Sequence, residues 1–156
     1  MIVGTDDDDW LEGTDGPDLI LGLDGHDEIE GGDGDDVICG GKGDDDILGQ
    51  QGNDLLFGNQ NADWIRGGTG NDTIRGGKGS DDLGGNRGQD IIYGGNGADI
   101  LSGGRGADLL YGGAGADDLY GNNGNDTLSG GNGEDYCAGG NGSDTAVLCE
   151  FVVGVP

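Results

Sequence analysis

A nine-residue repeat runs through almost the whole chain and constrains its fold more than any other feature. From residue 4 to residue 147 the sequence divides into sixteen consecutive nonapeptides without an insertion or a deletion. The first position is glycine and the sixth is aspartate in all sixteen, while the fourth is glycine and the eighth is leucine or isoleucine in fourteen. A single repeat of this length cannot bury an apolar core, so the repeats must stack on one another.

Each position of the repeat has a physical interpretation. Glycines at positions one, two and four permit positive φ, and they predict that the first six residues form a turn with inward-facing carbonyl groups. Positions seven to nine, such as Ile91-Ile92-Tyr93, predict a short strand whose middle residue is directed into the interior. Strands this short favour a parallel coil of two nonapeptides over a hairpin. The repeats then form eight coils in a rod about 38 Å long.

The composition adds a second constraint, because it is extreme. The chain of 156 residues contains 41 glycines, and its 32 acidic residues against 6 basic ones give a formal net charge of −26. Such a composition is typical of a disordered chain unless something neutralises the charge. The charge argues against a nucleic-acid partner, and no apolar run reaches the length of a membrane span.

The acidic residues are strongly biased toward one type, since 27 are aspartate and only 5 are glutamate. Short carboxylates beside inward-facing carbonyl groups supply the oxygen ligands that hard cations prefer. Calcium suits flexible turns better than Mg²⁺, which requires a rigid octahedron, and better than Zn²⁺ or the transition metals. The residue types therefore favour calcium as the bound metal.

The pattern Gly-Gly-x-Gly-x-Asp-x-(Leu/Ile)-x is carried in full by residues 94–102 and 103–111. It resembles the RTX, or haemolysin-type, family of calcium-binding nonapeptide repeats, and the resemblance extends over residues 4–147. The resemblance implies an all-β fold. This fold is a right-handed parallel β-roll, or β-helix solenoid, of about eight 18-residue coils with calcium ions between the turns.

The resemblance also implies the ligands of these ions. Each ion would be held by position-six aspartates of neighbouring coils, such as Asp27 with Asp45, and by backbone carbonyls of the first four loop positions. Seven gaps on each of two edges would hold up to about 14 calcium ions. The candidate side-chain ligands are Asp9, Asp18, Asp27, Asp36, Asp45, Asp54, Asp63, Asp72, Asp81, Asp90, Asp99, Asp108, Asp117, Asp126, Asp135 and Asp144.

The energetics of one repeat indicate what the metal contributes. Ordering nine residues costs at least about 9 kcal/mol of backbone entropy, whereas burying one leucine or isoleucine returns about 2–3 kcal/mol. Stacked aspartates also repel one another. We therefore predict that the metal-free chain is disordered and that it folds cooperatively when calcium binds.

These inferences point to a calcium-binding structural module of a secreted protein rather than to an enzyme. The single histidine, His26, lies at a variable loop position, and neither a His-Glu-x-x-His helix nor a Gly-x-Ser-x-Gly elbow is present. No signal peptide is visible, so we expect a mature form or an excised domain.

The two ends of the repeat depart from the pattern. Residues 1–156 are expected to form a single repeat domain, in which the nonapeptide at 4–12 caps the N-terminus and the apolar tail at 148–156 caps the C-terminus. Cys137 falls at an interior position and Cys149 lies in the tail, so the two form either a disulfide or a pair of buried thiols. The disulfide, which we favour, implies an oxidising, extracellular setting. Cys39 is left unpaired.

Outward residues repeat with a period of two nonapeptides, and one of the two faces is much the more apolar. A contiguous apolar strip is typical of an interface, so the alternative function is adhesion, docking of a partner domain or homodimerisation through this face. Ice binding is a less favoured alternative, because the threonines on this face form no regular ladder. The candidate interface residues are Leu19, Val37, Leu55, Phe57, Ile91, Tyr93, Leu109 and Tyr111.

Overall fold

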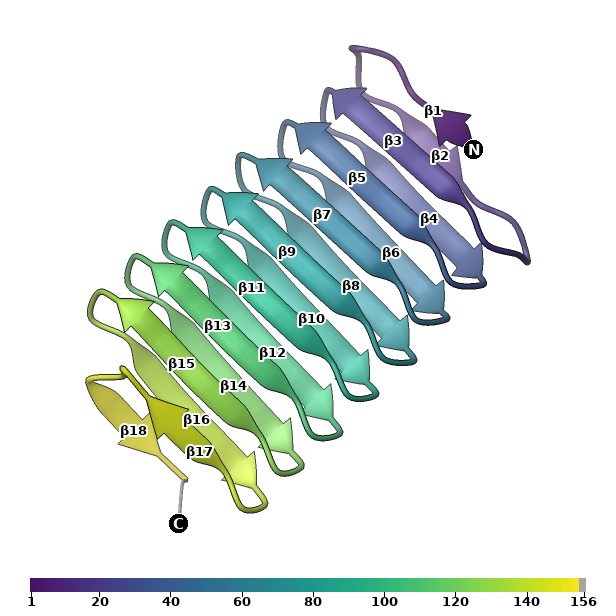
Figure 1. Ribbon diagram of the computed structural model, residues 1–156. Coiled ribbons are helices and arrows are strands. Elements are labelled where there is room, and N and C mark those ends of the chain that lie inside the picture. The colour runs from purple at the N-terminus through teal and green to yellow at the C-terminus, as the bar shows by residue number, and fades with distance from the viewer. Residues whose placement is uncertain (155–156) are drawn as a thin grey trace.

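Each nonapeptide contributes one strand, and successive strands fall alternately into two parallel sheets. The computed structural model, which describes residues 1–154, contains 18 strands and no helix among those residues. Every strand from β3 to β16 pairs with the second strand before it and the second after it, so two nonapeptides complete one coil (Figure 1). The chain is therefore the expected β-solenoid.

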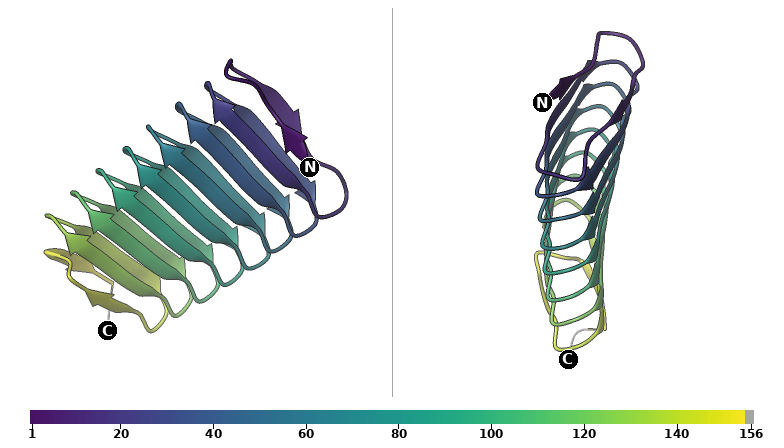
Figure 2. Two further views of the ribbon diagram at one scale, coloured as in Figure 1. Left: turned by 45° about the horizontal axis from the view of Figure 1, so that its top comes forward. Right: turned by 90° about the vertical axis from the view of Figure 1, so that its right-hand side faces the viewer.

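The two sheets face each other as two layers, joined along both edges by the turns (Figure 2). Each sheet has nine strands. The first contains β1 (Ile2–Val3), β3 (Leu19–Asp24), β5 (Val37–Lys42), β7 (Leu55–Gln60), β9 (Thr73–Lys78), β11 (Ile91–Asn96), β13 (Leu109–Ala114), β15 (Thr127–Asn132) and β17 (Thr145–Val147). The second contains β2 (Trp10–Glu12), β4 (Glu28–Asp33), β6 (Asp46–Gln51), β8 (Trp64–Thr69), β10 (Asp82–Arg87), β12 (Ile100–Arg105), β14 (Asp118–Asn123), β16 (Tyr136–Asn141) and β18 (Phe151–Val153).

The core is a single column of aliphatic side chains between the sheets. The position-eight residue of each repeat lies in this column, and its members from Ile20 to Leu128 are fully buried. Cys137 continues the column at its C-terminal end with no exposed surface. The alternation along each strand places this residue inside and its two neighbours outside, as the repeat predicts.

The strands are longer and the turns shorter than the sequence suggested. A full-length strand has six residues, at positions seven to nine and one to three, so the turn contains only positions four to six. The expectation that position-one glycines adopt positive φ is wrong, because positive φ is confined to positions two and four within the repeats, with Leu148 and Gly154 beyond them. Position one instead needs glycine for space. A Cβ at Gly31 would lie 2.6 Å from the Asp36 carboxylate and 2.7 Å from the Gly49 carbonyl oxygen of the next coil.

The array is closed at both ends by segments outside the regular repeat. At the N-terminus, β1 adds a strand before the first nonapeptide, and Ile2 packs against the core. At the C-terminus, β18 pairs with β16, and a disulfide joins Cys137 to Cys149 with a Cα–Cα separation of 6.1 Å. The disulfide alternative is therefore confirmed. Cys39 is free. Residues 1–154 include no helix that could span a membrane.

Candidate metal centre

The turns between the strands direct one carboxylate of each repeat into the interior of the solenoid. The position-six aspartate is the last residue of the turn, and the strand begins directly after it. These side chains are buried in fourteen of the sixteen repeats, with at most 6% of their surface exposed. They run from Asp27 to Asp144, and they form two columns because alternate turns lie on opposite edges.

One oxygen of each carboxylate ties neighbouring coils together. The Asp27 amide donates to Asp45 Oδ1 at 3.0 Å, and the Asp36 amide donates to Asp54 Oδ1 at 2.9 Å. The same bond, always between residues 18 apart, recurs along both columns as far as Asp144. The structure therefore places side by side the aspartates that the repeat pattern predicted to be neighbours.

The other oxygen has no partner. Oδ2 is buried and without a hydrogen bond in fourteen aspartates, which are Asp27, Asp36, Asp45, Asp54, Asp63, Asp72, Asp81, Asp90, Asp99, Asp108, Asp117, Asp126, Asp135 and Asp144. A buried carboxylate oxygen left unpaired is costly, and such groups are normally paired or bound to metal. A ladder of unpaired, buried carboxylate oxygens is the arrangement expected of metal ligands.

The space beside each unpartnered oxygen is a cradle made by the position-one glycine. A Cβ at Gly112 would lie 2.5 Å from Asp117 Oδ2 and 2.5 Å from the carbonyl oxygen of Gly130, one coil further along. At Gly121 the corresponding oxygens belong to Asp126 and Gly139. Two oxygens from adjacent coils thus converge where a side chain would otherwise stand, which fits a cation.

The electrostatics of the buried aspartates also favour a bound cation. Burial raises the pKa of Asp63 to about 8 and that of Asp90 to about 7. Burial also raises the pKa values of Asp45, Asp54, Asp72, Asp99, Asp108 and Asp117 to about 6. The three ion pairs among the described residues involve Asp18, Asp24 and Asp82, none of which is one of these fourteen. The ionised ladder therefore lacks compensating positive charge from the chain itself.

The first two position-six aspartates differ from the other fourteen. Asp9 Oδ2 accepts hydrogen bonds from the Thr5 amide at 2.6 Å and the Thr5 hydroxyl at 2.9 Å. Asp18 Oδ2 accepts from the Thr14 amide and hydroxyl, both at 2.8 Å. The sequence set apart only the first nonapeptide, residues 4–12, as the N-terminal cap. The signal that marks both is a threonine at position two.

The ligand set matches calcium better than a softer metal. No three His, Cys, Asp or Glu side chains converge within residues 1–154, so a bound ion would take much of its coordination from backbone carbonyls. Calcium accepts carbonyl and carboxylate oxygens in flexible geometry, whereas structural zinc sites are built from cysteine and histidine. The residues present therefore fit the metal that the repeat pattern predicted.

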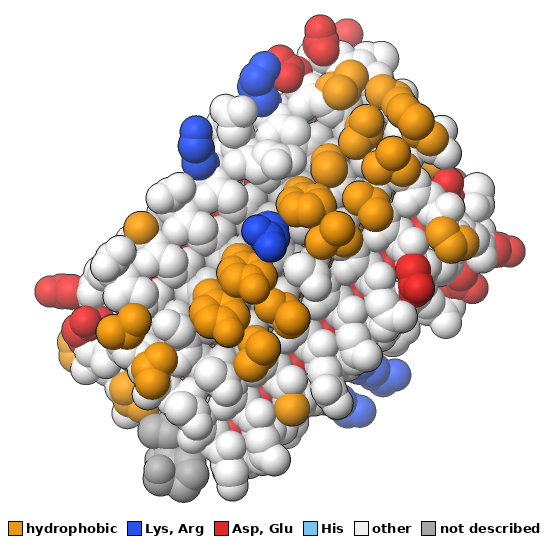
Figure 3. Space-filling model, in the orientation of Figure 1, with side chains coloured by type: hydrophobic (Ala, Val, Ile, Leu, Met, Phe, Trp, Pro, Cys, Tyr) orange, Lys and Arg blue, Asp and Glu red, His pale blue; other side chains and the backbone are white. Residues whose placement is uncertain are grey.

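The outer face of the first sheet carries the predicted apolar strip. Figure 3 shows hydrophobic side chains gathered over its strands, and Leu19 is 39% exposed. The register places Val37 beside Leu55 and stacks Tyr93 on Tyr111, with ring centroids 5.1 Å apart. Arg75 lies between Phe57 and Tyr93 and covers the Tyr93 ring. The eight candidate residues thus share one face, which a single cation interrupts.

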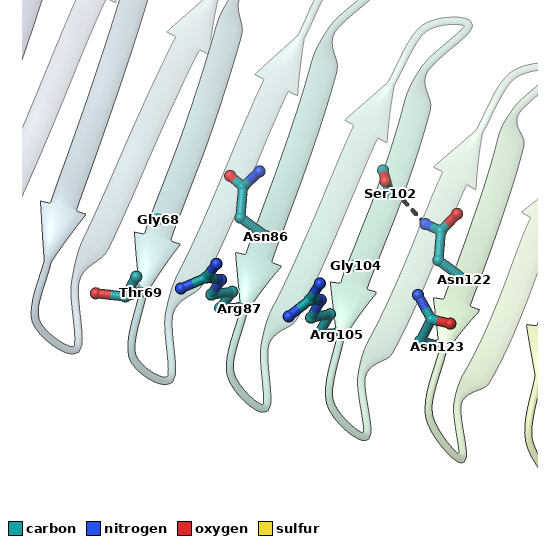
Figure 4. Close-up of a pocket in the computed structure, with 9 residues that line it drawn as sticks. All are labelled: Gly68, Thr69, Asn86, Arg87, Ser102, Gly104, Arg105, Asn122 and Asn123. Carbon is teal, nitrogen blue, oxygen red and sulfur yellow. Dashed lines mark hydrogen bonds between the residues drawn. The ribbon is translucent and has the colours of Figure 1, made fainter.

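A shallow hollow lies on the outer face of the second sheet, over β8 to β14 (Figure 4). Asn122 donates to the Ser102 hydroxyl at 3.0 Å there. The side chains face solvent, and no buried unpartnered polar atom points into the hollow, so it is a poorer candidate site than the aspartate columns. Its lining residues are Gly68, Thr69, Asn86, Arg87, Ser102, Gly104, Arg105, Asn122 and Asn123.

Comparison with known families identifies the repeat. The sequence model described as RTX calcium-binding nonapeptide repeat (4 copies) matches this chain several times over, in overlapping stretches. The matched residues are 3–38, 21–56, 57–92, 76–110, 93–128 and 111–146. A search of curated proteins finds no match to the chain.

Proposed function

Because the chain belongs to the family of RTX calcium-binding nonapeptide repeats, we propose that its buried aspartates hold calcium ions that make folding of the chain possible. The observation that carries this proposal is the set of fourteen buried Oδ2 atoms without a partner. Bound calcium would supply the positive charge that these carboxylates lack. The position-six aspartates and the position-one carbonyls of the following coil are the proposed ligands, and the role is structural rather than catalytic.

The geometry suggests how many ions are bound. Further chain follows on the same edge of the solenoid after every one of these aspartates except Asp144: another repeat turn after twelve of them, and the segment containing Leu148 and Glu150 after Asp135. A carbonyl oxygen of that following chain is among the nearest atoms beside the position-one glycine in eight of these repeats, at Gly22, Gly31, Gly49, Gly76, Gly94, Gly112, Gly121 and Gly130. Asp9 and Asp18 are satisfied by threonines. The fourteen unpartnered oxygens, less that of Asp144, correspond to thirteen candidate sites, each between one turn and the chain that follows it on the same edge. Thirteen divalent ions would balance the formal net charge of −26.

We place this module outside the cell. Extracellular calcium modules bind with dissociation constants of about 10⁻⁴–10⁻³ M, so the chain would stay unfolded at low cytosolic calcium and fold after export. The Cys137–Cys149 disulfide is consistent with an oxidising compartment. RTX repeat proteins are typically secreted, which also supports this placement.

Counting the ions tests the proposal directly. We expect native mass spectrometry at saturating calcium to find about thirteen bound ions. We expect Asp81→Asn to lose at least one, because that substitution removes a carboxylate from a column where Oδ2 has no other partner. The control Asp46→Asn changes an exposed aspartate on the outer face and should keep the full count. A wild-type chain that binds no calcium would refute the proposed function.

The apolar strip favours a second candidate role, which is self-association through the first sheet. Aligned apolar side chains on an open sheet face are typical of an interface. We expect a dimeric mass by light scattering at saturating calcium, and a monomeric mass for Leu55→Asp combined with Leu109→Asp. A wild-type monomer at all concentrations would contradict this role and leave calcium binding untouched.

A further inference from the structure

The nonapeptide pattern ends at residue 147, but the hydrogen-bonded ladder continues beyond it. Within the array, paired residues are 18 apart, as in Asp118↔Tyr136. The last pairing in the second sheet is Tyr136↔Phe151, a separation of 15. The last coil is therefore three residues shorter than a full one. Its final residues, 148–153, are called the closing segment here, and they place β18 in the next position beside β16.

Glu150 replaces the aspartate that a full coil would have supplied. Along the column the amide of each aspartate donates to Oδ1 of the next, and Asp117 donates to Asp135 Oδ1 at 2.9 Å. At the end of the column, the Asp135 amide donates to Glu150 Oε2 at 2.7 Å. The longer glutamate side chain reaches the same group from a shorter loop.

The backbone of the closing segment supplies a carbonyl oxygen in the place where the next coil supplies one within the array. A Cβ at Gly112 would meet Asp117 Oδ2 and the carbonyl oxygen of Gly130. In the same way, a Cβ at Gly130 would meet Asp135 Oδ2 and the carbonyl oxygen of Leu148. That same carbonyl accepts the Gly131 amide at 3.1 Å. Leu148 adopts a φ of 54°, which is uncommon for a leucine and turns the chain at this point.

The Asp135 carboxylate at this place has an unpaired oxygen, like the carboxylates inside the array. Asp135 has no exposed surface, and its Oδ2 has no hydrogen-bond partner. This buried oxygen and the Leu148 carbonyl oxygen both lie beside Gly130. The end of the column therefore offers the same elements as an internal site, although no nonapeptide supplies the second half.

We propose that Leu148 and Glu150 close a terminal calcium site on Asp135, and that the Cys137–Cys149 disulfide holds these two residues in place. The proposal rests on the proposed function, since it assumes that the internal cradles bind calcium. Cys149 lies between the two closing residues, and its bond to the buried Cys137 fixes them to the core. The disulfide is thus a positioning element for a metal site.

Native mass spectrometry of the full chain, at a calcium concentration that saturates the wild type, tests the site. We expect Glu150→Ala to bind one ion fewer. The matched control is Glu134→Ala, which removes an exposed acidic residue next to Asp135 and should keep the wild-type count. A wild-type count in Glu150→Ala would overturn the terminal site, whereas absence of calcium from the wild type would refute the proposed function itself.

Glu150→Gln keeps the test valid if the alanine variant does not fold. The glutamine side chain can still accept the hydrogen bond from the Asp135 amide, but it lacks the negative charge. We therefore expect the calcium affinity of the terminal site to fall on the order of tenfold. Hydrogen exchange at saturating calcium should show lost protection confined to residues near Asp135 and the closing segment. Unchanged affinity and protection in this variant would show that Glu150 only caps an amide, and would overturn its role as a ligand.

Cys149→Ala tests the positioning role separately. We expect this variant to lose the same ion and the same local protection as Glu150→Ala, while the internal sites remain filled. If the variant keeps the wild-type ion count and protection, the disulfide does not position the site. An unchanged far-ultraviolet circular dichroism spectrum at saturating calcium would confirm that the rest of the array remains folded.

Discussion

Removing calcium at neutral pH is expected to abolish the β structure of this chain. The fold buries fourteen carboxylate oxygens that no group of the chain satisfies. Burying an ion without its partner costs several kcal/mol in real proteins, and a domain has only about 5–15 kcal/mol of total stability. Even a few such groups exceed that margin, so the metal-free chain at pH 7.5 should be an expanded coil.

Circular dichroism and small-angle X-ray scattering would measure this transition. We expect the strand signal to disappear with excess chelator, and the radius of gyration to rise to about 40 Å, the value for an unfolded chain of this length. Added calcium should restore both in a single cooperative step, because each proposed ion joins neighbouring coils. Magnesium at the same concentration should not. Strand signal that persists after exhaustive chelation would contradict the prediction.

The repeat pattern predicted the architecture because the same residue types recur at the same positions of nearly every repeat. One apolar residue at position eight defines the core column from Ile20 to Leu128, and the unbroken period fixes which strands pair. The outward residues could also be assigned to their faces, since Leu55 lies between Val37 and Thr73 in the ladder as the period requires.

The role of the position-one glycine could not be inferred from the sequence. A glycine in a turn suggests positive φ, but Gly31 and its equivalents lie in extended strands. At Gly31 the space that a side chain would need is occupied by the Asp36 carboxylate and by the Gly49 carbonyl oxygen of the next coil. The carbonyl belongs to a residue 18 positions away, a contact that composition at a single position does not reveal.

The two ends were the least predictable parts of the site. Thr14 occupies position two, where the pattern has glycine, and only the structure shows that its hydroxyl satisfies Asp18. Glu150 lies beyond the last repeat and out of register, so no spacing rule places it beside Asp135. Ends of a repeat protein lack one neighbour, and the chain replaces that neighbour with residues that the periodic pattern does not contain.

Acid is expected to restore β structure to the metal-free chain. Burial raises the pKa of Asp63 to about 8 and of Asp90 to about 7, against 3.8 for an ordinary aspartate. Above pH 4 the folded form therefore holds protons that the unfolded chain has released, so the free energy of unfolding decreases as the pH rises through the folded pKa values. This stabilisation is fully present below about pH 4 and is lost between about pH 6 and pH 8.

Protonation also makes the carboxyl group a hydrogen-bond donor. A neutral carboxyl group can donate from Oδ2, and the space beside Gly112 holds both Asp117 Oδ2 and the carbonyl oxygen of Gly130, which is an acceptor. With chelator present, we expect the circular dichroism strand signal to increase as the pH is lowered from 8 to 5. Light scattering should show that the acid form is not an aggregate. A strand signal that stays absent down to pH 5 would contradict the prediction.

The calcium-loaded chain should show the opposite pH dependence, because calcium requires the ionised carboxylates and protons compete with it. We therefore expect the calcium concentration needed for folding to rise as the pH falls below about 6. Asp63→Asn mimics one permanently protonated ladder residue. In chelator it should shift the acid-folding midpoint to higher pH, while with calcium it should weaken binding. The control Asp46→Asn, on the outer face, should change neither. Equal effects of the two substitutions would show that general charge reduction, rather than the buried column, governs the pH response.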